Sequence, residues 1–117
     1  MPDPLVTGLS IGPVTRAADI ARAIAWSLRP AEDPAPPPSW LLDGQRRSFR
    51  RVTAALRRYR GALLADPVGS GKTYVALAAA ASLNPRGPTA CLVPATLVQQ
   101  WQAAAARVGA NVQVTSH

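Results

Sequence analysis

The stretch of sequence that decides the fold is residues 63–73, which read Leu63-Leu64-Ala65-Asp66-Pro67-Val68-Gly69-Ser70-Gly71-Lys72-Thr73. The apolar run at 62–65 is bounded by glycine and proline, which is typical of a buried parallel strand. A glycine-containing loop follows at 68–73. The segment 74–83 is apolar nearly all round, which predicts a helix that is covered on most sides. A strand, a glycine-rich loop and a helix in this order favour a loop that cradles phosphate.

The residue types of the loop fit that chemistry. Gly69 and Gly71 supply the permissive backbone that lets several N–H groups converge on a polyphosphate. The ammonium of Lys72 can neutralise the outer phosphates, and the hydroxyl of Thr73 can ligate Mg²⁺. The sequence therefore predicts a site for a polyphosphate with Mg²⁺, whose binding loop is Val68, Gly69, Ser70, Gly71, Lys72 and Thr73. The alternative is a glycine-rich turn that happens to precede Lys-Thr.

Helices and strands alternate downstream of the loop. Residues 84–88 contain two prolines and a glycine and end the preceding helix. A second buried strand is expected at 89–93, a helix at 96–108 closed by Gly109, and a third strand from Val112. This alternation predicts an α/β fold with a parallel sheet and crossover helices.

A helix is also expected upstream of the loop, from Gly44 to Arg60. Asp43 is its expected N-cap, and Gly61 stands where a left-handed C-terminal cap is wanted. The apolar residues of this helix recur at helical spacing and form one face, which we expect to be buried: Phe49, Val52, Leu56 and Tyr59.

The prolines before this helix divide the chain. Residues 30–39 carry a proline-rich run that predicts an extended linker. A short amphipathic helix is expected at 14–28, with Thr15 as its N-cap. We therefore divide the chain into an N-terminal extension at 1–29, the linker at 30–39 and a lobe that begins at residue 40 and runs to 117.

The basic charge of the chain is concentrated in one helix. The chain of 117 residues has a formal net charge of +7, and residues 43–60 carry seven arginines against one aspartate, a net of +6. Most of these arginines fall opposite the apolar face, which is typical of a solvated helix face. Contact with nucleic acid is the alternative. The arginines are Arg46, Arg47, Arg50, Arg51, Arg57, Arg58 and Arg60.

The remaining composition excludes several classes. Cys91 is the only cysteine and His117 the only histidine, so neither an internal disulfide nor a cysteine and histidine metal site is expected. No apolar run reaches the roughly 18 residues that a membrane span needs, and the first residues do not resemble a secretion signal. We expect a cytoplasmic protein with no membrane partner.

Residues 63–73 resemble motif I of the superfamily 2 helicases, and most closely the Swi2/Snf2 branch. The motif of that branch begins Leu-Ala-Asp-Glu and ends Gly-Leu-Gly-Lys-Thr. Pro67 stands where that motif has glutamate, and Ser70 stands where it has leucine. DEAD-box proteins carry serine at the position of Ser70. The resemblance implies an incomplete RecA-like P-loop NTPase lobe, in which Asp66 shapes the loop and carries no chemistry.

Two flanking features resemble the same family. Gln45 lies 27 residues before Lys72, where such enzymes place the glutamine that reads adenine. The alternative for Gln45 is a solvated residue at the start of a helix. Residues 91–101 resemble motif Ia, which implies that Thr96 touches the phosphates of a nucleic-acid strand. The alternative for Thr96 is a helix N-cap. We expect Trp101 to pack between helix and sheet rather than to stack on a base.

The resemblance implies the N-terminal part of a DNA-dependent ATPase or helicase-like translocase of the Swi2/Snf2 type, with DNA or RNA as its partner. Hydrolysis requires a downstream acidic pair and an arginine from a second lobe. No acidic residue lies between Thr73 and His117, so no complete catalytic set is expected here. We interpret the chain as a truncated lobe that binds ATP without turnover. The alternative is a stand-alone, non-hydrolysing P-loop module in an assembly.

Overall fold

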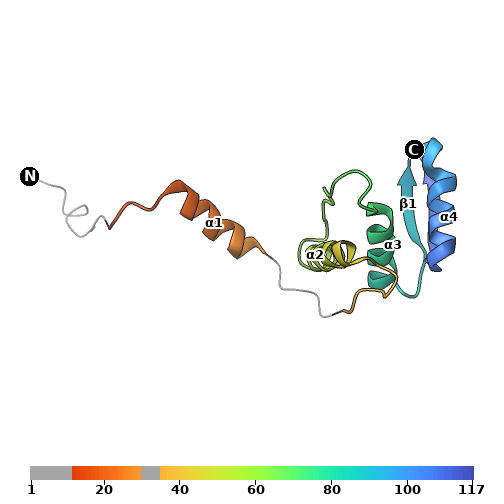
Figure 1. Ribbon diagram of the computed structural model, residues 1–117, viewed down its shortest axis with the longest axis horizontal. Helices are drawn as coiled ribbons and strands as arrows, with labels where there is room; N and C mark the ends of the chain where they lie inside the picture. Colours follow the sequence, from red (N-terminus) through yellow and green to blue (C-terminus); the bar gives the residue numbers. More distant parts are fainter. Residues whose placement is uncertain (1–11, 30–34) are drawn as a thin grey trace, which may run out of the picture.

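The computed structural model describes residues 12–29 and 35–117 (Figure 1). Helices and strands alternate along the second stretch, as expected for an α/β protein. The elements are α1 (Ala17–Leu28), α2 (Asp43–Tyr59), α3 (Lys72–Leu83), β1 (Thr89–Val93), the short 3₁₀ helix η1 (Ala95–Leu97), α4 (Val98–Val108) and β2 (Val112–Ser116).

The two strands β1 and β2 lie side by side and run parallel. Thr89 is opposite Val112 and Val93 is opposite Ser116. Helix α4 connects them and ends at Gly109, whose φ of 69° gives the left-handed cap that the glycine predicted. The expected parallel pairing with a crossover helix is therefore confirmed. The helix itself begins at Val98, two residues later than expected, because η1 takes up residues 95–97.

The strand expected at 62–65 is not formed. These residues form neither a helix nor a strand, and 91% of Leu63 is exposed. A strand exists only when a neighbour accepts and donates its backbone hydrogen bonds. In the described part of the chain, β1 and β2 pair with each other and no other segment pairs with residues 62–65. The local apolar run was therefore insufficient evidence for a strand.

Helix ends also differ from the expected positions. Asp43 is the first residue of α2 rather than its cap, and Leu42 is the N-cap. At the other end Arg60, not Gly61, takes the left-handed conformation with φ of 62°, because the helix stops one residue early and the N–H of Arg60 bonds to the carbonyl of Leu56 at 3.0 Å. Helix α1 starts from Arg16 rather than from Thr15.

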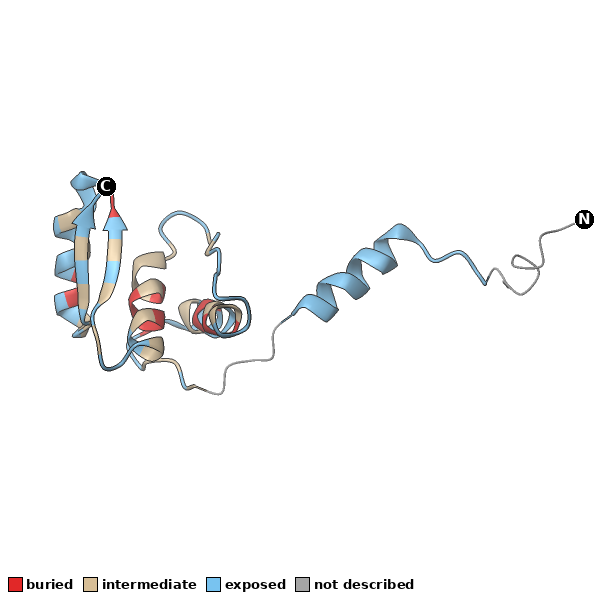
Figure 2. Ribbon diagram, turned by 180° about the vertical axis from the view of Figure 1, so that it is seen from behind, coloured by how far each residue is buried: buried red, intermediate tan, exposed pale blue. Residues whose placement is uncertain are grey.

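Helix α3 lies between α2 and α4 (Figure 2). Phe49 of α2 is fully buried and packs with Leu41, Val75 and Ala78. The expected apolar face of α2 ends before Tyr59, which is 48% exposed. The Tyr59 hydroxyl instead donates a hydrogen bond to the backbone carbonyl of Leu28, the last residue of α1.

Another apolar cluster joins α3 to α4. Leu77, Ala104 and Ala105 are buried in it, and Trp101 packs against them together with Val112 of β2. Trp101 therefore lies between helices and strand, as the sequence predicted. The enclosure of α3 on both sides explains why its sequence is apolar nearly all round.

The N-terminal regions are described in part. Helix α1 is exposed along its whole length within the described stretch 12–29. The expected linker is described from residue 35 onward, where residues 35–39 form neither helix nor strand, while 1–11 and 30–34 lie outside the described residues. The division of the chain into extension, linker and lobe stays a prediction. None of the helices in the two described stretches combines the length and apolarity of a membrane span.

Cys91 offers a test of the packing of β1. Burial raises the pKa of the Cys91 thiol above its ordinary value. Because the thiolate is the reactive form, we expect iodoacetamide to alkylate Cys91 more slowly than a cysteine in an unfolded peptide at mildly alkaline pH, with the rate rising at higher pH. The pH dependence of alkylation, followed by mass spectrometry, checks this. A rate equal to that of the peptide would show that β1 does not bury the thiol.

Candidate functional site

The loop before α3 has the backbone of an anion-binding turn. Gly69 and Gly71 have φ values of 82° and 81°, which side chains other than glycine rarely adopt. The N–H of Ser70 bonds to the carbonyl of Pro67 at 3.2 Å and closes the turn. Gly71 then serves as the N-cap of α3, so the first N–H groups of the helix have no intrahelical acceptor and lie at its positive end.

Lys72 folds back across the start of the loop. Its Nζ donates to the carbonyl of Asp66 at 2.7 Å and to that of Pro67 at 3.1 Å. An ammonium has three donors, so one remains for a ligand. The lysine is half-buried and is itself the first residue of α3, the helix whose first N–H groups have no intrahelical acceptor. This is a positive, donor-rich environment.

Ser70 leaves a buried polar atom without a partner. Its Oγ is buried and makes no hydrogen bond to any residue that the structure describes. Buried hydroxyls in folded proteins are nearly always hydrogen-bonded, so an orphaned one calls for an explanation. Beside a loop rich in N–H donors, a bound phosphate oxygen is a partner that fits.

Gln45 packs directly on the loop. Its Oε1 accepts the N–H of Leu42 at 3.0 Å, and its Nε2 donates to the carbonyl of Ser70 at 3.2 Å. A Cβ atom on Gly71 would stand 2.1 Å from that Nε2, so the contact requires glycine. The amide group keeps one further donor and one further acceptor position. The fold thus joins two predicted site residues that lie far apart in the sequence.

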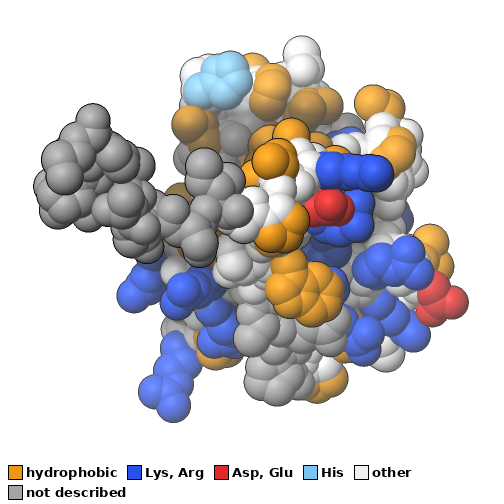
Figure 3. Space-filling view, turned by 90° about the vertical axis from the view of Figure 1, so that its left-hand side faces the viewer, with side chains coloured by type: hydrophobic (Ala, Val, Ile, Leu, Met, Phe, Trp, Pro, Cys, Tyr) orange, Lys and Arg blue, Asp and Glu red, His pale blue; other side chains and the backbone are white. Residues whose placement is uncertain are grey.

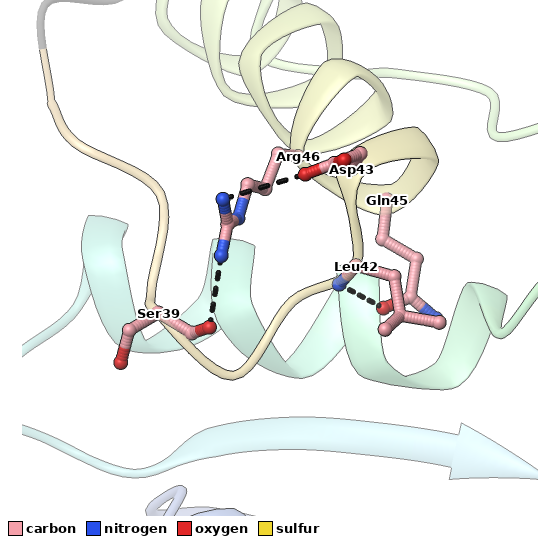
Figure 4. A network of polar contacts seen from close by, with 5 residues as sticks. All are labelled: Ser39, Leu42, Asp43, Gln45 and Arg46. Atoms are coloured by element: carbon pink, nitrogen blue, oxygen red, sulfur yellow. Dashed lines mark hydrogen bonds and ion pairs between the residues drawn. The ribbon is translucent and has the colours of Figure 1, made fainter.

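The start of α2 is held by polar contacts (Figure 4). An Arg46 nitrogen donates to the carbonyl of Ser39 at 3.0 Å, and another lies 3.5 Å from an oxygen of Asp43. The Leu42 to Gln45 hydrogen bond closes the first turn. These contacts fix the direction from which Gln45 reaches the loop.

Ser48 is a site residue that the sequence did not predict. It is buried one turn after Gln45, and its Oγ donates to Oδ2 of Asp66 at 2.5 Å. Helix α2 therefore contacts the loop at both ends, at Asp66 through Ser48 and at Ser70 through Gln45. The only signal in the sequence was a serine at helical spacing from Gln45, next to the buried Phe49.

Thr96 lies in η1, exposed, just beyond the end of β1. The N-cap of η1 is Pro94 and that of α4 is Leu97, so the interpretation of Thr96 as a helix N-cap is wrong. Figure 1 shows the start of α3 and the tip of β1 at the same end of the protein. The predicted contact of Thr96 with a nucleic-acid strand stays a prediction.

The structure describes no ready-made metal site. Among the described residues, no three histidine, cysteine, aspartate or glutamate side chains gather where they could hold an ion. Thr73 is half-buried in the first turn of α3. Its predicted role in binding Mg²⁺ therefore depends on phosphate oxygens that a nucleotide would bring.

Comparison with known proteins agrees with the motif analysis at the level of the family. A family model described as "Type III restriction enzyme, res subunit" matches residues 40–115, and this is a superfamily 2 helicase-like ATPase domain. The match spans α2, the loop, α3 and both strands. No curated protein matches the chain.

Proposed function

We propose, because the chain belongs to the family of the type III restriction enzyme res subunit, that its residues 40–117 bind ATP with Mg²⁺ as part of a helicase-like ATPase. One observation carries the proposal. Gln45 of α2 lies on Gly71, within hydrogen-bonding distance of Ser70, so a group suited to read a purine base stands beside a loop suited to hold phosphate.

The residues present fit a nucleotide. The first N–H groups of α3, the free donor of Lys72 and the orphaned Ser70 hydroxyl would hold the phosphates. Thr73 would ligate Mg²⁺, and this ion supplies the charge neutralisation that a polyphosphate needs. The remaining donor and acceptor of the Gln45 amide would take the adenine edge. Val68 and Gly69 complete the loop without adding bulk near the phosphates.

A finer assignment is the Swi2/Snf2 branch, with DNA as the partner. Its support is the pattern at 91–101, in which a strand ends in Val93-Pro94 and Thr96 and Trp101 follow. Thr96 is exposed in η1, just beyond the end of β1, and the tip of β1 lies at the end of the molecule where α3 begins (Figure 1). A nucleic-acid phosphate bound there would lie at the same edge as the nucleotide.

A second candidate is a nucleotide-binding module without turnover. Hydrolysis needs a carboxylate that holds Mg²⁺ and orients water, and no acidic side chain among residues 74–117 can supply it, so these residues by themselves support binding and not turnover. Both candidates make the same prediction for binding. They differ in whether the nucleotide drives movement along DNA in a larger assembly.

We expect the 117-residue protein to bind ATP without hydrolysing it. Binding is measured by titrating a fluorescent ATP analogue in the presence of Mg²⁺, with excess EDTA as the comparison, and turnover is measured as phosphate release with and without DNA. Saturable binding that weakens with EDTA, together with no phosphate release above the blank, is the expected result. Absence of saturable binding would contradict the proposed function. DNA-stimulated phosphate release from pure protein would contradict the expected lack of turnover.

A further inference from the structure

Helix α2 presents a second feature, on the side away from α3. Arg47, Arg50, Arg51 and Arg58 are all exposed there, and we name them the arginine stripe. Arg47, Arg51 and Arg58 are four and seven residues apart, a spacing that places them along one line of a helix. Ser48, Phe49 and Thr53 are buried on the inward side of the same helix, and Ala54, which lies between Arg51 and Arg58 along the line, is buried as well. The nucleotide site uses only the inward side.

The charge of the stripe is not compensated within the described part of the chain. Arg46 pairs with Asp43, whereas the guanidinium groups of Arg47, Arg50 and Arg51 make no ion pair or hydrogen bond with any described residue. Like charges three or four residues apart on a helix destabilise it by roughly 0.2–0.5 kcal/mol per pair. The chain therefore keeps an internal repulsion that a bound polyanion would relieve.

The stripe borders a groove. The groove has a volume of about 1130 Å³. Its lining includes Arg47, Arg50 and Arg51 of α2, residues 62–66, the end of α1 at Ala25, Leu28 and Arg29, and Asp43. Leu63 stands almost fully exposed in this lining. Figure 3 shows basic side chains spread over this side of the molecule with few acidic ones among them. The groove thus combines guanidinium groups with apolar side chains, and the two carboxylates that line it belong to Asp43 and Asp66.

We propose that the arginine stripe and this groove bind the phosphate backbone of a nucleic-acid strand. At about 1.5 Å per residue, Arg47 to Arg58 extends roughly 16 Å along α2. A B-DNA strand carries one phosphate per about 3.4 Å of axis, so the stripe can reach several phosphates in a row. Guanidinium forks bind phosphate through paired hydrogen bonds, and the apolar side chain of Leu63 can pack against sugar or base. This linear arrangement favours a nucleic acid over an acidic protein.

The test compares two variants that lose the same charge. Arg47→Ala with Arg51→Ala removes two members of the stripe, while Arg16→Ala with Arg22→Ala removes two exposed arginines on or beside α1. Affinity for a labelled single-stranded oligonucleotide and for a duplex is measured by fluorescence anisotropy across a salt series. We expect the stripe variant to bind about tenfold more weakly, and its salt slope to fall by about 1.4 for the single strand and about 1.8 for the duplex.

The control variant is expected to change affinity less than about twofold, since its arginines lie outside the groove. Arg47→Lys with Arg51→Lys keeps the charge and is expected to retain most of the affinity. Equal weakening of the stripe and control variants would overturn the proposal, because it would show an effect of net charge alone. Displacement of the oligonucleotide by polyglutamate at equal charge concentration would overturn it in favour of an acidic protein partner. Circular dichroism and unchanged binding of the ATP analogue show that the stripe variant is folded, and they keep this proposal separate from that for the nucleotide site.

Discussion

Replacement of Lys72 by alanine is expected to weaken ATP binding by about 10- to 150-fold. The ammonium is the one cationic side chain among residues 66–73, and it bonds to the carbonyls of Asp66 and Pro67. A hydrogen bond to a charged group contributes about 1.5–3 kcal/mol, and each 1.4 kcal/mol corresponds to about tenfold in affinity. Titration of the fluorescent ATP analogue measures the loss.

The matched control is Arg86→Ala, which removes one exposed cation from the turn after α3. We expect the ATP affinity of this variant to stay within about twofold of that of the unmodified protein. Arg86 and the loop lie at opposite ends of α3, roughly 18 Å apart at about 1.5 Å per residue, and salt screens exposed charges at such a separation. Lys72→Arg is expected to bind poorly as well, because a planar guanidinium cannot replace a compact ammonium inside the loop. Thermal melts should show that all three variants are folded. Undiminished ATP binding by Lys72→Ala would show that this loop is not the phosphate site.

Replacement of Gly71 by alanine is expected to disturb both the loop and Gln45. The new Cβ would stand 2.1 Å from Nε2 of Gln45, and the φ of 81° is strained for alanine. Such a backbone conformation costs about 1–3 kcal/mol for a residue other than glycine, before the clash is counted. We therefore expect lower stability in urea and the loss of most ATP affinity, because Gln45 must leave its position beside Ser70.

Gly69→Ala separates the two causes. Gly69 has a φ of 82°, but among the described residues nothing lies within 4 Å of the Cβ that the substitution adds. It therefore reproduces the strain without the clash, and we expect a smaller loss of stability than for Gly71→Ala. Gln45→Ala combined with Gly71→Ala removes the clash and should be more stable than Gly71→Ala alone. Equal unfolding free energies for the two single glycine variants would contradict this expectation and show that moving the Gln45 amide away from Gly71 costs no measurable stability.

The parts of the fold that follow from local signals could be predicted from the sequence. Helix α3, strand β1 and the end of α4 at Gly109 each depend on residues that are neighbours along the chain. The strand expected at 62–65 failed because pairing is not local: the apolar run satisfies the pattern, but no described segment supplies its hydrogen bonds. The left-handed cap of α2 lies at Arg60, one residue before the predicted Gly61, because the conformations in which a helix ends one residue earlier or later differ little in free energy.

The candidate site divides in the same way. The proposed phosphate loop is contiguous, so its glycines, Lys72 and Thr73 could be proposed from their order along the chain. The contact of Gln45 with Gly71 joins residues that are distant in sequence, and the family resemblance suggested the role of Gln45 but not this packing. The hydrogen bond from Ser48 to Asp66 could not be foreseen, because it depends on how α2 turns toward the loop. The arginines were visible in the sequence, whereas their groove required the position of residues 62–66.

The most direct test of the central claim is an amide NMR titration of the protein with ATP and Mg²⁺. ATP is itself a polyanion, so binding alone does not separate the phosphate loop from the arginine stripe. We predict that the largest shifts occur at the backbone amides of residues 69–73 and at the side-chain amide of Gln45, and that Lys72→Ala abolishes them. Shifts confined to the exposed face of α2, or unchanged in Lys72→Ala, would contradict the assignment of the loop as the nucleotide site.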